Sequence, residues 1–294
     1  MKIIQGEEVA LRRGLEYRGG VFHSRLLLEG EAGTVGNFQL SIGVSQGDFY
    51  SPRHRHNFEQ IRVGLEGTLD FGRDGRLTPG VVGYFPEGVF YGPQTQNPDE
   101  TAAAAVLQFG GASGSGYLSN AEVRAGVQAL AAFGEFKNGV FRRRLPFHGK
   151  KNADGYQAIW EHHHQRPLRY PPPRYPLPIF MDSSNYAWVP VEGAPGASEK
   201  LLGVFTERRT QARLIKLDAG AQYVARGRSV YLVLRGAGAI GAEPMRALTA
   251  LDLDRGEAAT IAAREESELM HFGLPDLAGL SLPQPAEVAA EAAE

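Results

Sequence analysis

Two histidines stand two positions apart near the start of the chain, His54 and His56, in the stretch SPRHRHNFEQIRVGLEG. Residues two apart point to the same side of an extended chain, so both imidazoles can reach one point. Imidazole nitrogen is a ligand for iron, manganese, nickel, zinc and copper. The pair therefore predicts a divalent metal site, although an isolated pair of this kind is also typical of a solvated polar strand that holds no ion.

Gln60 and Tyr91 are the candidates for completing such a site. Gln60 can offer its neutral amide oxygen to a metal, or can act as a hydrogen-bond partner behind the ligands. Tyr91 can offer a phenolic oxygen to a metal, or can line the cavity as a general acid or base. We predict His54, His56 and Gln60 as metal ligands and Tyr91 as a catalytic acid/base group.

Arg62 adds a guanidinium to the same stretch. A buried guanidinium without a partner is costly. One interpretation is a forked contact with a substrate carboxylate or enolate, and the other is an ion pair with a protein acid such as Glu59 or Asp70. We predict Arg62 as a catalytic residue that neutralises an anionic substrate. Gln108 can face the same cavity, although a structural hydrogen bond is its simpler role.

Two further stretches invite a functional interpretation and do not support one. Consecutive histidines, His162 to His164 in EHHHQ, point about 100° apart on a helix and cannot converge on one ion. The glycine-rich GGASGSGY, residues 110–117, lacks the lysine and the spacing of phosphate-binding loops. We interpret it as a flexible loop that can serve as a lid at a barrel mouth.

The elements that must position these residues are short strands. Alternating apolar and polar residues, separated by glycine and proline turns, predict strands in 38–44, 59–67, 68–80, 81–94 and 102–111, and again in 201–220, 229–240, 258–263 and 268–274. Helical spacing predicts helices in 120–136, with Asn120 as N-cap, and in 153–165. The proline-dense 166–178 cannot form a helix or a central strand. Regularly spaced short strands are typical of a sandwich or barrel.

The motifs resemble those of the cupin superfamily. The first cupin motif is matched in spacing by His54, His56, Gln60 and Gly67, and the second by GVVGYFPEGVFY, residues 80–91. Two residue types depart from the family pattern: Gln60 replaces a glutamate, and Tyr91 replaces a histidine. Both departures put the strength of the metal site in doubt.

The second half resembles a cupin barrel that has lost its chemistry. Aligning Gly236 with Gly67 places Tyr223, Ala225 and Ser229 at the first ligand positions, and the last falls near Ser267. The resemblance therefore implies an all-β bicupin of two double-stranded β-helix (jelly-roll) barrels with a few connecting helices. We predict an N-terminal barrel with the metal site (1–118), a helical and proline-rich connector (119–195) and a degenerate C-terminal barrel (196–294).

Composition narrows the partners. The formal net charge is −2 and cysteine is absent from the 294 residues, so neither a nucleic acid nor an anionic membrane is expected as a partner, and no disulfide or thiolate site can form. The N-terminus lacks the apolar core of a signal peptide, which predicts a cytoplasmic protein. The sequence leaves open whether the barrels pack within one chain or across a homodimer.

The resemblance implies an enzyme that holds a divalent metal, iron as first choice and manganese, nickel, zinc or copper as alternatives. The expected substrate is a small anionic or phenolic molecule, and the expected chemistry is that of a dioxygenase. Two alternatives remain: a bicupin that binds a small molecule without catalysis, and a cupin isomerase or lyase that uses Tyr91 as its acid or base.

Overall fold

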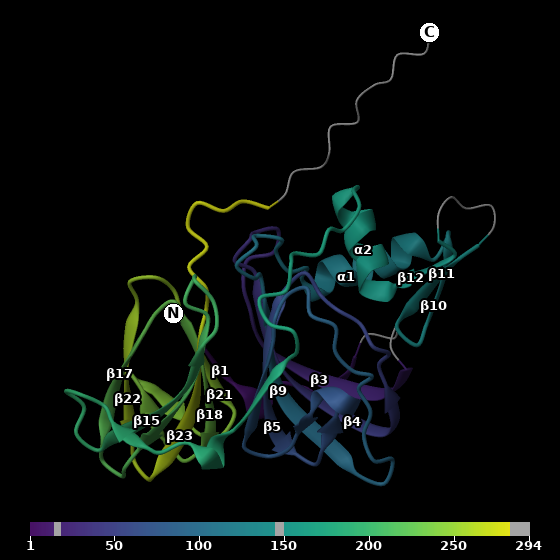
Figure 1. Ribbon diagram of the computed structural model, residues 1–294. Helices are drawn as coiled ribbons and strands as arrows, with labels where there is room; N and C mark the ends of the chain where they lie inside the picture. The colour runs from purple at the N-terminus through teal and green to yellow at the C-terminus, as the bar shows by residue number, and fades with distance from the viewer. Residues whose placement is uncertain (15–18, 145–149, 283–294) are drawn as a thin grey trace.

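The structure is a computed structural model that describes residues 1–14, 19–144 and 150–282. Two β-barrels lie side by side, and a pair of helices covers one end of the first barrel (Figure 1). Antiparallel strands make up both barrels. The prediction of an all-β protein with two barrels and few helices is confirmed.

The first barrel is built on a seven-stranded antiparallel sheet in the order β13-β8-β5-β9-β4-β3-β2. The bounds are β2 (Arg12–Arg13), β3 (Gly19–Glu29), β4 (Phe38–Tyr50), β5 (Glu59–Glu66), β8 (Val81–Phe85), β9 (Thr101–Phe109) and β13 (Ile179–Asp182). Its second layer is less regular. It consists of the hairpin β6 (Leu69–Asp70) and β7 (Arg76–Leu77), with single bridges that join 51 to 94, 54 to 91 and 70 to 95.

The second barrel has a seven-stranded sheet, β1-β21-β18-β23-β16-β15-β14, and a four-stranded one, β17-β22-β19-β20. The bounds in the first sheet are β1 (Lys2–Gln5), β14 (Val189–Pro190), β15 (Ala197–Val204), β16 (Gln211–Leu217), β18 (Ser229–Arg235), β21 (Thr249–Leu253) and β23 (Ser267–Gly273). Those in the second are β17 (Gln222–Arg226), β19 (Gly238–Ile240), β20 (Glu243–Met245) and β22 (Ala258–Ala263).

The two barrels exchange strands at their edges. Strand β1, at the very start of the chain, pairs with β21 in the second barrel. Strand β13, from the middle of the connector, pairs with β8 in the first barrel. The strands thus cross the boundaries that the sequence suggested after residues 118 and 195. The end of the predicted C-terminal domain, residues 283–294, lies outside the described residues.

The connector begins with a small insert that packs on the first barrel. It contains α1 (Asn120–Leu130), α2 (Gly155–His164) and the three-stranded sheet of β10 (Gly134–Lys137), β11 (Val140–Arg143) and β12 (Asn152–Asp154). The first helix is capped by Ser119 in a capping box with Glu122, so the predicted cap at Asn120 is wrong by one residue.

Within the described residues, no helix is long and apolar enough to cross a membrane. The proline-rich 166–178 forms neither helix nor strand, as predicted.

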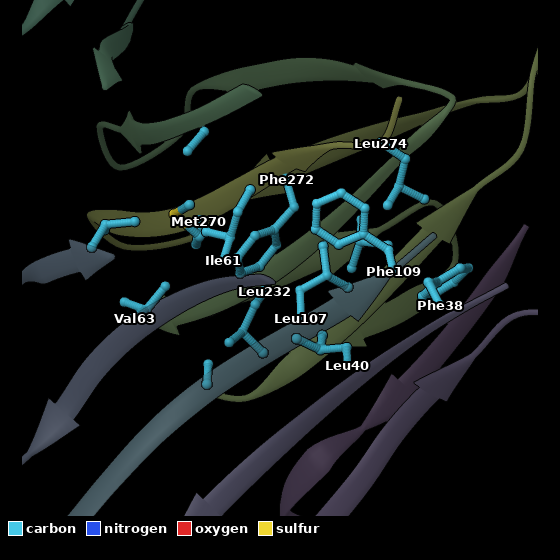
Figure 2. Close-up of a cluster of buried hydrophobic side chains, with 14 of the residues drawn as sticks. Phe38, Leu40, Ile61, Val63, Leu107, Phe109, Leu232, Met270, Phe272 and Leu274 are labelled. Atoms are coloured by element: carbon cyan, nitrogen blue, oxygen red, sulfur yellow. The ribbon is translucent and has the colours of Figure 1, made fainter. Parts of the chain in front are cut away.

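The faces of β5 explain how the barrels join and where the cavity lies. Ile61 and Val63 point outward, into an apolar cluster shared with Leu232, Met270 and Phe272 of the second barrel (Figure 2). The alternate residues point inward, and Arg62 lines a cavity. A strand with one polar and one aliphatic face can pack in this way only when the aliphatic face is covered. The second barrel provides that cover.

Candidate functional site

His54 and His56 lie inside the first barrel, in the loop that precedes β5. Both are buried, and their ring centroids are 4.7 Å apart. The sequence placed the pair on a regular strand, whereas only His54 forms a β-bridge. His54 and Tyr91 exchange two backbone hydrogen bonds of 3.1 and 2.9 Å, and the N–H of Gly88 donates to the carbonyl of His56 at 2.7 Å. The two motifs are thereby fastened to each other.

The His54 ring is oriented by the backbone. Its Nδ1 lies 2.6 Å from the carbonyl oxygen of Pro52. A carbonyl oxygen can only accept, so Nδ1 carries the proton and Nε2 of the neutral ring keeps its lone pair. Metal-binding histidines are commonly oriented by such a hydrogen bond. The Tyr91 ring lies nearby, with its centroid 4.5 Å from that of His54 and 5.8 Å from that of His56.

Gln60 faces the same interior but is engaged by two neighbours. Its amide oxygen accepts the Nε–H and Nη2–H of Arg62 at 2.9 and 2.7 Å. Its amide nitrogen donates to the Tyr91 hydroxyl at 2.9 Å. Both ends of the amide are thus in use, and metal ligation by Gln60 would require the Arg62 contacts to rearrange. The assignment of Gln60 as a ligand stays a prediction.

Arg62 is buried among neutral groups and aromatic rings. Besides Gln60, it donates to the side-chain oxygen of Gln94 at 2.8 Å and to the Tyr91 hydroxyl at 3.2 Å. Its guanidinium carbon lies 4.6 Å from the centroid of the Phe85 ring. The two carboxylates considered as partners from the sequence make their hydrogen bonds elsewhere: Glu59 accepts from Thr210, and Asp70 accepts from Arg76.

Of these residues, His56, Arg62 and Gln94 line a cavity of about 490 Å³ that reaches from the barrel interior to its helix-covered end. The charged residues of its lining are Arg12, Arg13, Arg62, Arg124 and Glu29. Among the described residues of the lining, four guanidiniums face one carboxylate, which gives this part of the cavity a positive potential that attracts anions. The volume is in the range of pockets that bind small molecules.

A cluster of aromatic side chains connects His56 to the helical insert, and the sequence did not reveal it. Phe58 stacks on His56 with ring centroids 4.3 Å apart, and Tyr156 of α2 meets His56 edge-on at 5.6 Å. Tyr117, at the end of the glycine-rich loop, also lines the cavity and donates to the amide oxygen of Gln108 at 3.1 Å. Gln108 therefore faces the cavity and has the structural bond expected of it.

Glu59 occupies the opposite face of β5 and is fully buried between the barrels. Burial raises its pKa to about 8, and the charge of Glu87 adds to the effect. The hydroxyl of Thr210, from the second barrel, donates to one carboxylate oxygen at 3.0 Å. This carboxyl group belongs to the interface between the barrels and is separated from the cavity by the strand itself.

The consecutive histidines and the glycine-rich loop have defined places in the structure. Within 1–14, 19–144 and 150–282, no group of three or more histidines, aspartates and glutamates is placed to hold a metal ion. His162 to His164 lie at the end of α2, where His163 is paired with Glu122 at 3.5 Å. That helix packs on α1 at the end of the first barrel rather than between the barrels (Figure 1). The loop 110–117 is tied down at Ser113, which donates to Glu87.

The second barrel has different residues at the equivalent places. Tyr223 pairs with Ile261 across β17 and β22, as His54 pairs with Tyr91 in the first barrel. Ala225 is buried in the apolar interior, and Ser229 contacts His271 on β23. Ser267 lies at the other end of β23. The positions equivalent to the predicted ligands thus carry Tyr223, Ala225, Ser229 and Ser267, none of which is a histidine.

Comparisons with known proteins agree with this architecture. No protein-family model and no curated protein sequence matches the chain. Among solved structures, a dioxygenase candidate from Nostoc punctiforme is similar over 92% of this chain and 81% of its own, with 13% identity and a TM-score of 0.62. A pirin from Escherichia coli in complex with nickel(II) is similar over 93% and 98%, with 12% identity and a TM-score of 0.51.

An oxalate decarboxylase from Bacillus subtilis with Mn(II) centres is a third similar structure, with 13% identity over 93% of this chain and 77% of its own and a TM-score of 0.51. Identities of this size show the fold. The chain accordingly has the two-barrel cupin fold that its motifs predicted. Its candidate site lies in the first barrel, in a cavity of positive potential lined by histidine, tyrosine and arginine.

Proposed function

We propose that the first barrel binds a divalent metal through His54, His56 and the phenolic oxygen of Tyr91, and that the protein is an oxygenase acting on a small aromatic or oxygen-rich acid. The orientation of His54 carries the proposal, because the Pro52 carbonyl accepts from Nδ1–H, and Nε2 of this buried ring is then the nitrogen that keeps its lone pair. A metal bound there supplies Lewis-acid and redox chemistry. Iron is our first choice, and manganese, nickel, zinc and copper are compatible with the same donors.

The chemistry of the donor set supports this proposal. Two imidazoles and one oxygen donor suit first-row divalent metals. The Tyr91 oxygen receives hydrogen bonds from Gln60 and Arg62, and both donors stabilise negative charge on that oxygen. We infer that Gln60 acts behind the ligands, by orienting Arg62 and Tyr91, because its amide oxygen accepts two hydrogen bonds from Arg62.

The cavity itself supports an anionic substrate. Arg62 brings positive charge to the inner end, and Arg12, Arg13 and Arg124 are the other cations of the lining. The aromatic faces of Phe58 and Tyr156 beside His56 can pack against a planar ring. An aromatic acid would thus have its carboxylate attracted by Arg62 and its ring packed against aromatic side chains.

The test joins metal analysis to turnover. Protein purified without chelator, and the same protein reconstituted with Fe(II), is assayed for bound metal and for oxygen uptake with catechols, flavonols, benzoates and 2-hydroxy acids. The control is the double variant His54→Ala/His56→Ala. We expect close to one metal per chain and oxygen uptake with at least one aromatic acid, both lost in the double variant. Equal rates of oxygen uptake in the wild type and the double variant would overturn the proposal that the protein is an oxygenase.

A non-catalytic binder is the second candidate, favoured by one observation. The residue at the position of the family's acidic ligand, Gln60, is neutral and bonded to Arg62 and Tyr91. A binder would hold anionic aromatic ligands with an affinity that chelators leave unchanged, and would show no oxygen uptake after reconstitution. A third possibility, a lyase or isomerase with Tyr91 as acid or base, would turn over its substrate with a pH-rate profile that is indifferent to chelators.

A further inference from the structure

The second barrel contains a polar cluster of its own, away from the positions equivalent to the predicted ligands of the first barrel. Arg213 on β16 is the direct cross-strand neighbour of His271 on β23, and His271 is the neighbour of Tyr231 on β18. All three lie on the inward face of the sheet, since their outward-facing neighbours Leu214, Met270 and Leu232 pack against the first barrel. Their side chains therefore meet inside the second barrel.

This cluster is built by specific contacts. His271 is 5% exposed, stacks on Tyr231 with ring centroids 4.6 Å apart, and has its Nε2 2.8 Å from the hydroxyl of Ser229. Arg213 donates Nη1–H to Glu199 at 2.7 Å and Nη2–H to Gln211 at 2.6 Å. Gln211 lies over Gly273, where an added Cβ would be 2.3 Å from the Gln211 Cγ. Glycine there leaves room for the amide that holds Arg213.

Two buried nitrogen atoms in the cluster have no hydrogen-bond partner within the described part of the chain: Nδ1 of His271 and Nε of Arg213. Buried polar atoms in native proteins are nearly always paired. These two belong to residues that face each other directly across neighbouring strands. If Ser229 donates to Nε2, the neutral ring of His271 carries its proton on Nδ1. The cluster can then present two N–H donors to a single acceptor.

The charges around the cluster select the acceptor. Tyr223 lies at the edge of the cluster. The charged side chains close enough to act on it are the cations Arg213 and Arg226 and the anion Glu199. The charge that acts on His271 is that of Arg213. The balance is positive, which favours an anion over a neutral carbonyl compound. The side chain of Arg213 is 23% exposed and that of Glu199 is 27% exposed, so this ion pair lies at the solvent-facing edge of the cluster, whereas the two nitrogen atoms without partners are themselves buried.

We propose that the second barrel binds a small monocarboxylate, whose two oxygen atoms accept hydrogen bonds from Nε–H of Arg213 and Nδ1–H of His271. Ser229 sets the tautomer of His271, and Gln211 and Glu199 fix the plane of the guanidinium. The site is independent of the metal and of the cavity in the first barrel. It gives the second barrel a ligand of its own rather than a purely structural role.

Nuclear magnetic resonance of the imidazole nitrogens of the full chain tests this directly. The ring signals of His271 are assigned by their loss in the variant His271→Gln. Sodium acetate is then titrated into wild type, Arg213→Gln and Arg213→Lys, with sodium chloride at equal ionic strength as control. Arg213→Lys keeps the charge beside Glu199, which protects folding, but lacks the Nε–H. Arg62→Gln serves as the matched variant in the first barrel.

We expect acetate, and not chloride, to shift the Nδ1 signal of His271 along a saturable curve. We expect Arg213→Gln and Arg213→Lys to weaken that binding at least tenfold, because a charge-assisted hydrogen bond is lost, and Arg62→Gln to leave it unchanged. A wild-type spectrum that responds identically to acetate and chloride would overturn the site. So would a folded Arg213→Lys variant with the wild-type acetate curve. Neither result depends on whether the first barrel is an oxygenase.

Discussion

The guanidinium of Arg62 clasps the side-chain amide of Gln60, two residues before it on β5, by donating both Nε–H and Nη2–H to one oxygen atom. Gln60 and Tyr91 are the two residues that depart from the cupin motifs, and they are hydrogen-bonded to each other. The amide nitrogen of Gln60 donates to the Tyr91 hydroxyl. A carboxylate in place of Gln60 would turn the contact into an ion pair. The amide of Gln60 is neutral, so its contact with Arg62 does not neutralise the guanidinium.

Gln60→Glu should therefore weaken the binding of anionic ligands. The new carboxylate would neutralise Arg62 at the distance of a hydrogen bond, and we expect the affinity for benzoate to fall about tenfold, which is roughly 1.4 kcal/mol. Isothermal titration calorimetry with benzoate measures the change, and benzyl alcohol is the neutral control, whose affinity should stay constant. Unchanged benzoate affinity would show that Arg62 does not contribute to anion binding.

Tyr91→Phe should reduce metal binding and remove a spectroscopic signature. A phenolate bound to Fe(III) gives a visible charge-transfer absorption, and phenylalanine keeps the ring packed beside Phe85 while lacking the oxygen. We expect the absorption to vanish and the affinity for the metal to fall at least tenfold. The spectrum of the Fe(III)-loaded variant is compared with that of wild type. An identical visible spectrum would exclude Tyr91 as a ligand and leave it as a cavity group.

Glu59 should make the protein less stable as the pH rises from 4.5 to 8. Burial raises the pKa of this carboxyl group from 4.5 to about 8, so in this interval the folded state binds more protons than the unfolded state. The contribution is fully present below pH 4.5 and is lost as the pH rises through 8, with a slope of up to about 1.4 kcal/mol per pH unit.

Glu59→Gln, which cannot ionise, should flatten that slope. Urea unfolding at pH 5, 6, 7 and 8 measures the free energy of unfolding for both proteins. Glu207→Gln, on an exposed carboxylate whose pKa Arg174 lowers to about 2, is a control that should not flatten the slope in this interval. Parallel curves for wild type and Glu59→Gln would contradict the assigned shift.

Ser119→Ala should destabilise the helical insert. The hydroxyl oxygen of Ser119 accepts a hydrogen bond from the backbone N–H of Glu122, and the carboxylate of Glu122 accepts one from the backbone N–H of Ser119. Loss of such a cap typically costs about 1 kcal/mol. Asn120→Ala is the matched control, because Asn120 is the first helical residue and has no capping role. Thermal unfolding that ranks the two variants in the opposite order would place the cap at Asn120 instead.

Sequence patterns predicted the fold well where local periodicity decides it. Alternation along β5 separates Ile61 and Val63 from Gln60 and Arg62, and the structure places the two sets on opposite faces. The cap of α1 was misplaced because Ser119 and Asn120 are both favourable capping residues, and only the backbone distinguishes them. Local pattern also predicted correctly that 166–178 forms neither a helix nor a central strand.

Residues that reach the site from distant segments could not be predicted. Tyr156 meets His56 from a helix about 100 residues later, and its spacing in that helix resembles that of any core residue. Tyr117 follows a glycine-rich loop whose path depends on Ser113 and Glu87. The bonding of Gln60 to Arg62 was equally hidden, since a shared face of a strand does not say which side chains turn toward each other.

Strand β1 cannot pair with its partner strand β21 until late in synthesis of the chain. Lys2–Gln5 pair with Thr249–Asp252, so this strand is made well before its partner and stays unpaired until the later strand has been synthesised. A protease that cut once between the barrels would not release two independent halves, because the amino-terminal fragment would still supply an edge to the other fragment's sheet. The barrels are therefore held together by the pairing of β1 with β21 as well as by the covalent chain. Dissociation of a chain that had been cut between the barrels would require these β-sheet hydrogen bonds to break.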